Sequence, residues 1–303
     1  MKKPFDFVAR RKLFVCISLA ILAVALLFNI IFGTEMDISF KGGTLVRYDY
    51  TGTVDVAVAE KTAASVLGND VTVKLETVNN TGVISVSLTD DISTDKMSAL
   101  DDAMVKAFPD NQVVQFSSNS LKASMGKRFF AKCLVAVALA AAFLLVYVGF
   151  RFKKIGGLSA GAFALLALAH DLLIVYFTFV IFRIPLNDNF VAVMLTILGY
   201  SLNDTIVIYD RIRENRRKLD PKTPIREVVN LSLNQSFVRT RNTSISTALA
   251  AGTIAVVALV LRMDAILSFA LPMLLGVVSG FYSSVCLSAP LWTIWMERKE
   301  KKA

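Results

Sequence analysis

An acidic residue stands inside a stretch of sequence that is otherwise long and apolar enough to cross a bilayer. The run from Phe190 to Tyr209 contains Asn203 and Asp204, and a charged segment that starts at Asp210 follows it at once. A carboxylate inside a membrane helix costs about 2.5–3.5 kcal/mol on insertion scales, so it usually faces a partner, a water-filled path or a proton relay. This feature indicates membrane transport.

The spacing around Asp204 places several polar groups on one face of the predicted helix. Tyr200, Asn203, Asp204 and Val207 occupy positions i, i+3, i+4 and i+7, a stripe expected to turn toward a partner helix rather than lipid. A carboxylate there could load and release a proton unless a cation holds it ionised. The alternative is structural, a buried ion pair or a hydrogen-bonded clamp with Asn203 or with Ser and Thr neighbours.

Arg239 is the cation expected to approach Asp204, because it opens the next helix from the same side. Arg239, Thr243 and Thr247 lie on one face of that helix and could present a polar track to the carboxylate. An arginine at a helix end can instead be an interfacial anchor.

A second polar pair, His170 and Asp171, lies in the middle of the third apolar stretch. Adjacent helix positions project about 100° apart, so we expect one side chain to face a neighbouring helix and the other a cavity. A hydrogen-bonded packing role is the alternative to a relay for both. Asp210, at the interface, is expected to be a cap paired with one of the nearby arginines, with relay duty as the alternative. The nearby arginines are Arg211, Arg213 and Arg217.

The elements that must position these residues are membrane helices. Hydrophobic residues make up 55% of the 303 residues, charged residues only 19%, and the mean hydropathy is +0.58, so an integral membrane protein is expected. Stretches of about 18 or more apolar residues predict six spanning helices. They cover 13–32, 131–150, 158–182, 190–209, 243–261 and 265–295. The last is long enough to tilt or to continue as an interfacial helix.

Lysines and arginines collect at four places, and this asymmetry predicts the orientation. Basic residues precede the first stretch, follow the second, fill the connection 211–242 and close the chain, whereas 183–189 and 262–264 hold one each. The positive-inside rule places both termini in the cytoplasm. The first stretch is too long for a signal peptide and is expected to be retained. The net charge of +9 is then topological, and nucleic-acid binding is not expected.

The remaining chemistry that composition could offer is sparse. All three cysteines, Cys16, Cys133 and Cys286, fall in apolar stretches, where they are expected to be small hydrophobic residues. A single histidine and the absence of Cys/His clusters predict no metal site. The sequence has no phosphate-binding glycine loop, so nucleotide binding is not expected. No other cofactor is expected, and the protein is not expected to be an enzyme.

The segment 33–130 is the expected external domain, between residues 1–32 and the helical part 131–303. Alternating patterns predict strands at 44–50, 71–78, 83–88 and 113–116, helical spacing predicts helices at 54–67 and 94–108, and Asn79–Gly82 suits a hairpin turn. The order β-α-β-β-α-β predicts a ferredoxin-like α+β fold.

Two smaller features complete the predictions. Gly42 and Gly43 permit a tight bend into the external domain, as a simple turn or as a hinge that transmits helix motion. Residues 225–231 follow Pro221 and Pro224 and predict a short amphipathic helix along the membrane surface.

Four sequence blocks together resemble the signature of the SecF family. They are Phe40–Thr44, Ala169–Ile174, Gly199–Asn215 and Asn234–Thr240. The resemblance spans nearly the whole chain and implies half of an RND-type transporter in a bacterial plasma membrane. It implies pairing with SecD, attachment to the SecYEG channel, a YajC-like subunit as a further partner, and use of the proton motive force to draw exported polypeptide across. In the family, the residues that match Asp204 and Arg239 are implicated in proton conduction.

Two other classes of function remain open. A proton-coupled exporter of lipids or small molecules would use the same RND half, but it would normally need a larger external domain than 33–130. A non-transporting scaffold would tolerate neutral residues in place of Asp204 and Arg239. Contact with membrane lipids is expected for all three.

Overall fold

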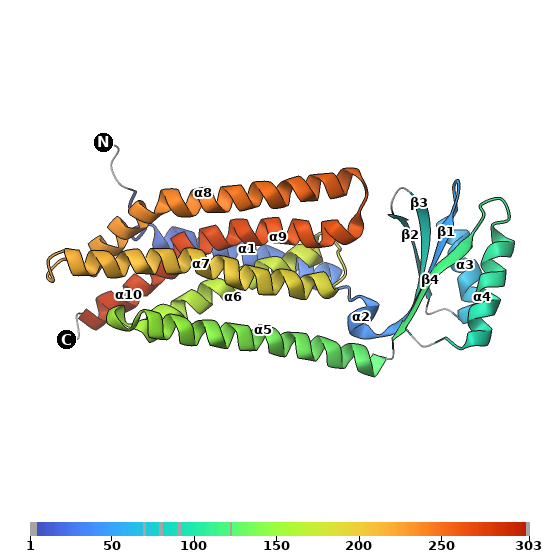
Figure 1. Cartoon of the computed structure of the whole chain (residues 1–303), viewed down its shortest axis with the longest axis horizontal. Coiled ribbons are helices and arrows are strands. Elements are labelled where there is room, and N and C mark those ends of the chain that lie inside the picture. Colours follow the sequence, from blue (N-terminus) through green and yellow to red (C-terminus); the bar gives the residue numbers. More distant parts are fainter. Residues whose placement is uncertain (1–4, 69–70, 79–80, 90–91, 122, 301–303) are drawn as a thin grey trace.

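The molecule consists of a bundle of long helices and a small α/β module beyond one end of it (Figure 1). The computed structural model describes residues 5–68, 71–78, 81–89, 92–121 and 123–300. Within these residues, six helices are long and apolar enough to cross a membrane, as predicted. They are α1 (Arg11–Phe32), α5 (Ala123–Arg151), α6 (Gly157–Ile181), α7 (Asp188–Lys218), α8 (Ile225–Val260) and the sixth, which starts with α9 (Asp264–Tyr282).

The helices differ in how much of their surface the bundle covers. Only 11% of the most apolar window of α1 and of α5 is buried, against 56% for α6 and 50% for α7. A helix that is apolar all round and uncovered suits contact with lipid. The helix α9 packs against α6, α7 and α8, although only 22% of the most apolar window of α8 is buried. A single 3-10 turn, η1 (Lys153–Ile155), separates α5 from α6.

The sixth stretch is not one regular helix. After α9, the π-helix η2 (Ser283–Ser288) leads into α10 (Ala289–Glu300). Pro290 offers no N–H to the carbonyl of Cys286, and its ring would crowd that carbonyl in a regular α-helix. The wider π-turn accommodates this proline, and the chain continues without a break.

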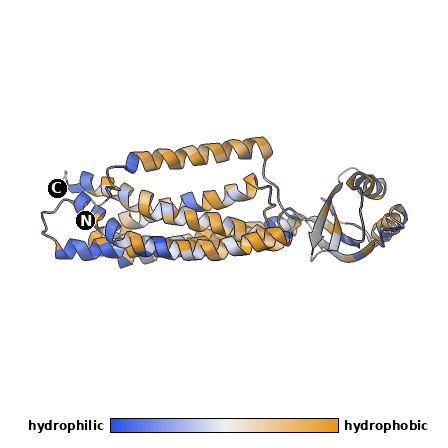
Figure 2. Ribbon diagram, turned by 90° about the horizontal axis from the view of Figure 1, so that it is seen from above, coloured by the Kyte–Doolittle hydropathy of each residue, from blue (hydrophilic) through white to orange (hydrophobic). Residues whose placement is uncertain are grey.

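At the end of the bundle that holds both termini, α8 begins earlier than predicted (Figure 1). Residues 225–231 form its first turns, so the prediction of a separate helix on the membrane surface is wrong. Val228 and Leu233 are buried, in a cluster with Ile212 of α7 and Trp292 of α10. Asn215 donates to the hydroxyl of Ser232 at 2.8 Å. The apolar face therefore packs on the extended end of α7. Figure 2 shows how hydrophilic residues gather at this end.

The α/β module has the predicted ferredoxin-like order. Its elements are β1 (Gly43–Tyr50), α3 (Val56–Leu67), β2 (Val71–Val78), β3 (Thr81–Leu88), α4 (Thr94–Ala107) and β4 (Val114–Leu121). The strands are antiparallel in the order β2-β3-β1-β4, and both helices cover one face (Figure 1). Val46, Ile84, Leu100 and Met104 form the core between sheet and helices. Asn79 and Asn80 of the predicted turn lie outside the described residues.

The link from α1 to β1 contains a short helix, α2 (Ile38–Lys41), that the sequence pattern did not predict. The predicted bend follows it: Gly42 and Gly43 have φ of 79° and 125°, a region that other residues rarely adopt. A Cβ atom on Gly43 would lie 2.2 Å from the carbonyl oxygen of Leu88. The chain therefore bends at these two positions, and the space at Gly43 admits only glycine.

Candidate functional site

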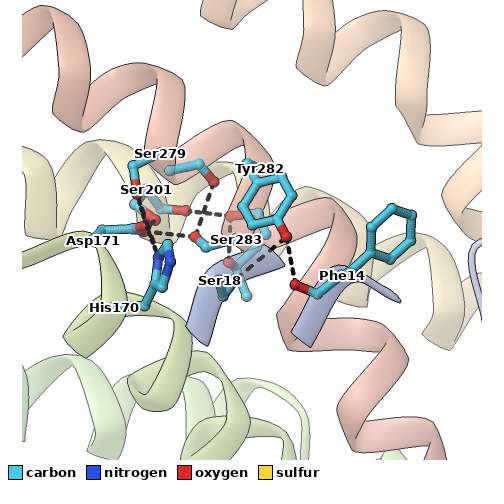
Figure 3. A network of polar contacts seen from close by, with 11 residues as sticks. Phe14, Ser18, His170, Asp171, Ser201, Ser279, Tyr282 and Ser283 are labelled. Carbon is cyan, nitrogen blue, oxygen red and sulfur yellow. Dashed lines mark hydrogen bonds and ion pairs between the residues drawn. The ribbon is translucent and has the colours of Figure 1, made fainter. Parts of the chain in front are cut away.

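Asp171 is the centre of a polar cluster buried between α6, α7 and α9 (Figure 3). Its side chain is fully buried and accepts three hydrogen bonds of 2.6 Å. The hydroxyl of Ser279 donates to Oδ1, while those of Ser201 and Ser283 donate to Oδ2. Hydroxyl donors of this kind stabilise a buried carboxylate. The buried carboxyl group thus receives hydrogen bonds from three different segments of helix.

His170 lies beside this carboxylate rather than in different surroundings, so the prediction that the two residues face different neighbours is wrong. Its Nδ1 is 3.2 Å from Asp171 Oδ1 and 3.4 Å from Ser279 Oγ. The two side chains bend toward the same hydroxyl, although their Cα–Cβ bonds diverge along the helix. Within the described chain, the Nε2 atom is buried without a hydrogen-bond partner.

Serines of α9 and η2 extend the cluster along α7. Ser284 lies 2.9 Å from the Thr205 hydroxyl and donates to the Ser201 carbonyl at 3.2 Å. One π-turn further on, Ser288 lies 3.2 Å from the hydroxyl of Tyr209. Sequence reasoning missed these serines, although they form two i, i+4 pairs, 279 with 283 and 284 with 288, in an apolar stretch. Interhelical hydrogen bonds of this kind are typical of membrane bundles.

The cluster also reaches the first helix, through Tyr282 (Figure 3). The Tyr282 hydroxyl donates to the carbonyl of Phe14 at 2.7 Å and accepts from Ser18 at 3.3 Å. Its ring lies 6.1 Å from the ring of His170, centre to centre. The helix α1 is therefore joined by polar contacts to the neighbourhood of Asp171.

Asp204 is also buried, 2% exposed, but its surroundings are sparser. Within the described residues, its one hydrogen bond comes from the hydroxyl of Ser244 in α8, at 3.0 Å. Asn203 is exposed on the outer surface of the bundle and does not share this site. Ser201 stands one helical turn before Asp204 and binds Asp171, so α7 brings the two carboxylates into one region.

Arg239 is not brought to Asp204. The two described side chains form no ion pair or hydrogen bond, and Arg239 is exposed. Thr243, on the same face, is exposed too and donates to the backbone of its own helix. Ser244, the neighbour of Thr243, supplies the contact to Asp204. The predicted polar track is thus on the wrong face of α8.

Arg239 instead lines a cleft of about 670 Å³ between α7 and α8, together with Asp210. As predicted, Asp210 pairs with Arg213, at 2.7 Å. Its second partner, Arg151 at 2.9 Å, belongs to α5 and was not predicted. The described residues contain no group of three or more His, Cys, Asp or Glu side chains that could hold a metal ion.

Comparison with known proteins gives the class to which this arrangement belongs. The sequence model described as "Protein export membrane protein SecD/SecF, C-terminal" matches residues 101–298. The translocase subunit SecF of Alicyclobacillus acidocaldarius is 34% identical over 309 aligned positions, which cover 100% of this chain and 96% of the relative. SecF of Petrotoga mobilis is 32% identical, covering 98% and 97%.

A solved structure extends the likeness to three dimensions. The crystal structure of SecDF from Thermus thermophilus, a translocon-associated membrane protein, matches with a TM-score of 0.81 and 26% identity over 98% of this chain. The chain spans 39% of the length of that protein, and 39% of SecDF from Bacillus subtilis, to which it is 30% identical. The chain belongs to the SecD/SecF family of protein export membrane proteins. It is a multi-pass membrane protein with a role in Sec-dependent export.

Proposed function

We propose that this chain is a SecF-type subunit that works with a SecD-like partner and couples proton movement across the membrane to the export of unfolded polypeptide. The observation that carries this proposal is the pair of buried carboxylates on α6 and α7, Asp171 and Asp204; Ser201, one helical turn before Asp204, donates to Asp171. Two acidic groups buried among apolar helices are costly, and a purely structural clamp could use Asn or Ser instead. Handling a proton requires a group whose charge can change.

The two carboxylates suit different tasks. Three hydroxyls, each at 2.6 Å, hold the side chain of Asp171 in place, which suits a fixed anchor. Asp204 has a single described donor, Ser244, and it stands on the same helix as the exposed Asn203. We therefore assign proton exchange to Asp204 and a positioning role to Asp171, with His170 as its neighbour. Asp210 and Arg239 line the cleft between α7 and α8, and in this proposal that end of the bundle faces the cytoplasm, where a proton could leave.

The need for a partner follows from the relatives. SecDF proteins carry, in one chain, more than twice the length that this chain covers, and we take the uncovered part to be a SecD-like half, as the name SecDF implies. The exposed Asn203 offers that half a polar contact. In this proposal the subunit lies in the bacterial plasma membrane with both termini in the cytoplasm, next to the SecYEG channel. A YajC-like subunit is a further candidate partner.

The test is protein export in cells whose only copy of the chain carries Asp204→Asn, with membrane abundance and co-purification of the SecD-like partner measured alongside. We expect export to fall severely at normal abundance. The matched control is Asp264→Asn, an exposed carboxylate at the start of α9, which should leave export unchanged. Normal export in the Asp204→Asn strain would instead favour an assembly scaffold.

A further inference from the structure

The chain that enters the α/β module is fastened to the outer ends of α6 and α7 by its backbone. Leu186, in the connection between these helices, donates its N–H to the carbonyl of Glu35 at 2.9 Å, and Asp37 donates to the carbonyl of Leu186 at 2.9 Å. Met36 and Leu186 thereby form a parallel β-bridge. On the preceding turn, the hydroxyls of Thr34 and Tyr176 are 2.6 Å apart. The link therefore follows any movement of this connection.

Arg183 strengthens this junction from the end of α6. Its φ of 56° lies in the left-handed region, where a residue other than glycine is strained and is held by its surroundings. The guanidinium donates to the carbonyl of Phe32, at the end of α1, at 2.7 Å, and it forms an ion pair with Glu35. One side chain thus joins α6, α1 and the link.

Glu35 has a second cation, and this one belongs to the module itself. Lys74 of β2 lies 3.3 Å from its carboxylate. The strand β2 is one edge of the sheet, and the opposite edge, β4, is followed in the chain by α5. Among the described contacts, the sheet is therefore held at both edges, by the chain at β4 and by the ion pair of Lys74 at β2.

We propose that Glu35, held between Arg183 and Lys74, is the positioning residue that fixes the external module to the outer ends of α6 and α7. These are the helices that carry Asp171 and Asp204, so a rearrangement around the carboxylates would reach the sheet through Arg183, Leu186 and Glu35. A consequence for export rests on the proposed function, whereas the positioning itself does not. The Lys74 side chain is 56% exposed, so its contact is the one that releases most readily.

The orientation of the module can be measured directly in the full chain in lipid nanodiscs, with the cysteines replaced by serine. Spin labels at Val105 of α4 and Arg262, between α8 and α9, are both exposed and report the distance from module to bundle. We expect Lys74→Gln to raise the population of displaced orientations about 1.5- to 5-fold, the range for an exposed ion pair. The matched control is Lys61→Gln, an exposed lysine of α3.

Two further variants separate the charge from the backbone. Arg183→Gly keeps the left-handed backbone but removes the guanidinium, and it should displace the module as Glu35→Gln does. Arg183→Lys keeps a cation near Glu35 and should restore part of the native distribution. In the unsubstituted chain, about 1 M salt, which shortens the Debye length to about 3 Å, should act like Lys74→Gln.

An unchanged distance distribution in Glu35→Gln, with the module still resistant to protease, would overturn the proposal. So would an equal shift in Lys61→Gln. The measurement needs neither a proton gradient nor a precursor, so it stands apart from the export test of Asp204→Asn. If that export test fails while the distances change as expected, the positioning role survives without its link to proton handling.

Discussion

The two parts of the molecule hold their elements together in different ways. In the bundle, buried polar side chains join the helices, with Asp171, Ser201 and Ser279 as examples. In the described part of the α/β module, the contacts between sheet and helices are mainly apolar, although Tyr48 donates to Asp101 at 2.7 Å and Gln115 donates to the sulfur of Met97 at 3.7 Å. Water drives apolar groups together, whereas lipid tails are as apolar as leucine and give no such force. The difference shows that hydrogen bonds join the helices where lipid surrounds them, whereas apolar burial joins sheet and helices where water surrounds them.

The largest effect should follow from Leu100→Ala in the module. Leu100 is fully buried between sheet and helices, so the cavity should cost about 2.7–5 kcal/mol of unfolding free energy. Val105→Ala on the same helix, 52% exposed, should cost no more than about 0.5 kcal/mol. Denaturation of the full chain, followed by protease sensitivity of the module, measures both. Similar losses at the two positions would break the comparison.

Asp171→Ala should have the corresponding effect in the bundle. It leaves three buried hydroxyls without their acceptor, and interhelical hydrogen bonds in membranes average about 0.6 kcal/mol, so we expect a loss of about 2 kcal/mol. Thermal unfolding in detergent and membrane abundance are the measurements. Asp264→Ala, on an exposed helix end, is the control. A stable Asp171→Ala protein would mean that apolar packing alone holds the bundle.

Tyr48→Phe tests a polar contact between sheet and helix in the module and should cost about 1 kcal/mol. Burial, and then the hydrogen bond to Asp101, raise the pKa of Tyr48 above its ordinary value of 10.0. Because the folded pKa is the higher one, this stabilisation is complete below about pH 10 and is lost as the pH rises further. Alkaline denaturation should therefore begin at higher pH in Tyr48→Phe. An identical alkaline profile would contradict this account.

Ser244→Ala should have the smallest effect on stability, about 0.6 kcal/mol, because it removes one hydrogen bond to Asp204. Export should nevertheless fall, since the proposed proton-exchanging group loses its described donor. The control is Ser246→Ala, exposed two positions further along α8. An export defect that merely parallels the loss of abundance would indicate a structural role for Ser244.

The sequence allowed the class of fold to be predicted, because each signal was long. Runs of apolar residues identified the six spans, and alternating patterns identified the strands around Val46 and Ile84. The buried acids Asp171 and Asp204 could be found because a carboxylate is conspicuous among apolar neighbours.

The partners of these acids could not be predicted in the same way. Serine is common in membrane helices as a small packing residue, so Ser244 and Ser279 did not stand out. The choice of Thr243 over Ser244 failed because neighbouring positions differ by about 100°, and sequence alone does not set the rotation of α8 about its axis. The extension of α8 to Ile225 was missed because its apolar face suits the membrane surface as well as a neighbouring helix.

The π-turns of η2 determine how far α10 is rotated about the helix axis relative to α9. If the 6 residues of Ser283–Ser288 were all kept but closed into an ordinary α-helix, each would turn the chain by about 100° instead of the smaller angle of a π-turn, so α10 would be rotated by about 100° about its axis. Ser288 would then lose Tyr209, and Trp292 would lose the hydroxyl of Ser159, to which it donates at 3.1 Å. Deletion of one residue of the segment, such as Val285, would offset that rotation, because one α-helical residue turns the chain by the same angle. The one extra residue of the π-segment therefore sets the rotation of α10, so that one continuous helix contacts α7 at one level and the start of α6 at another.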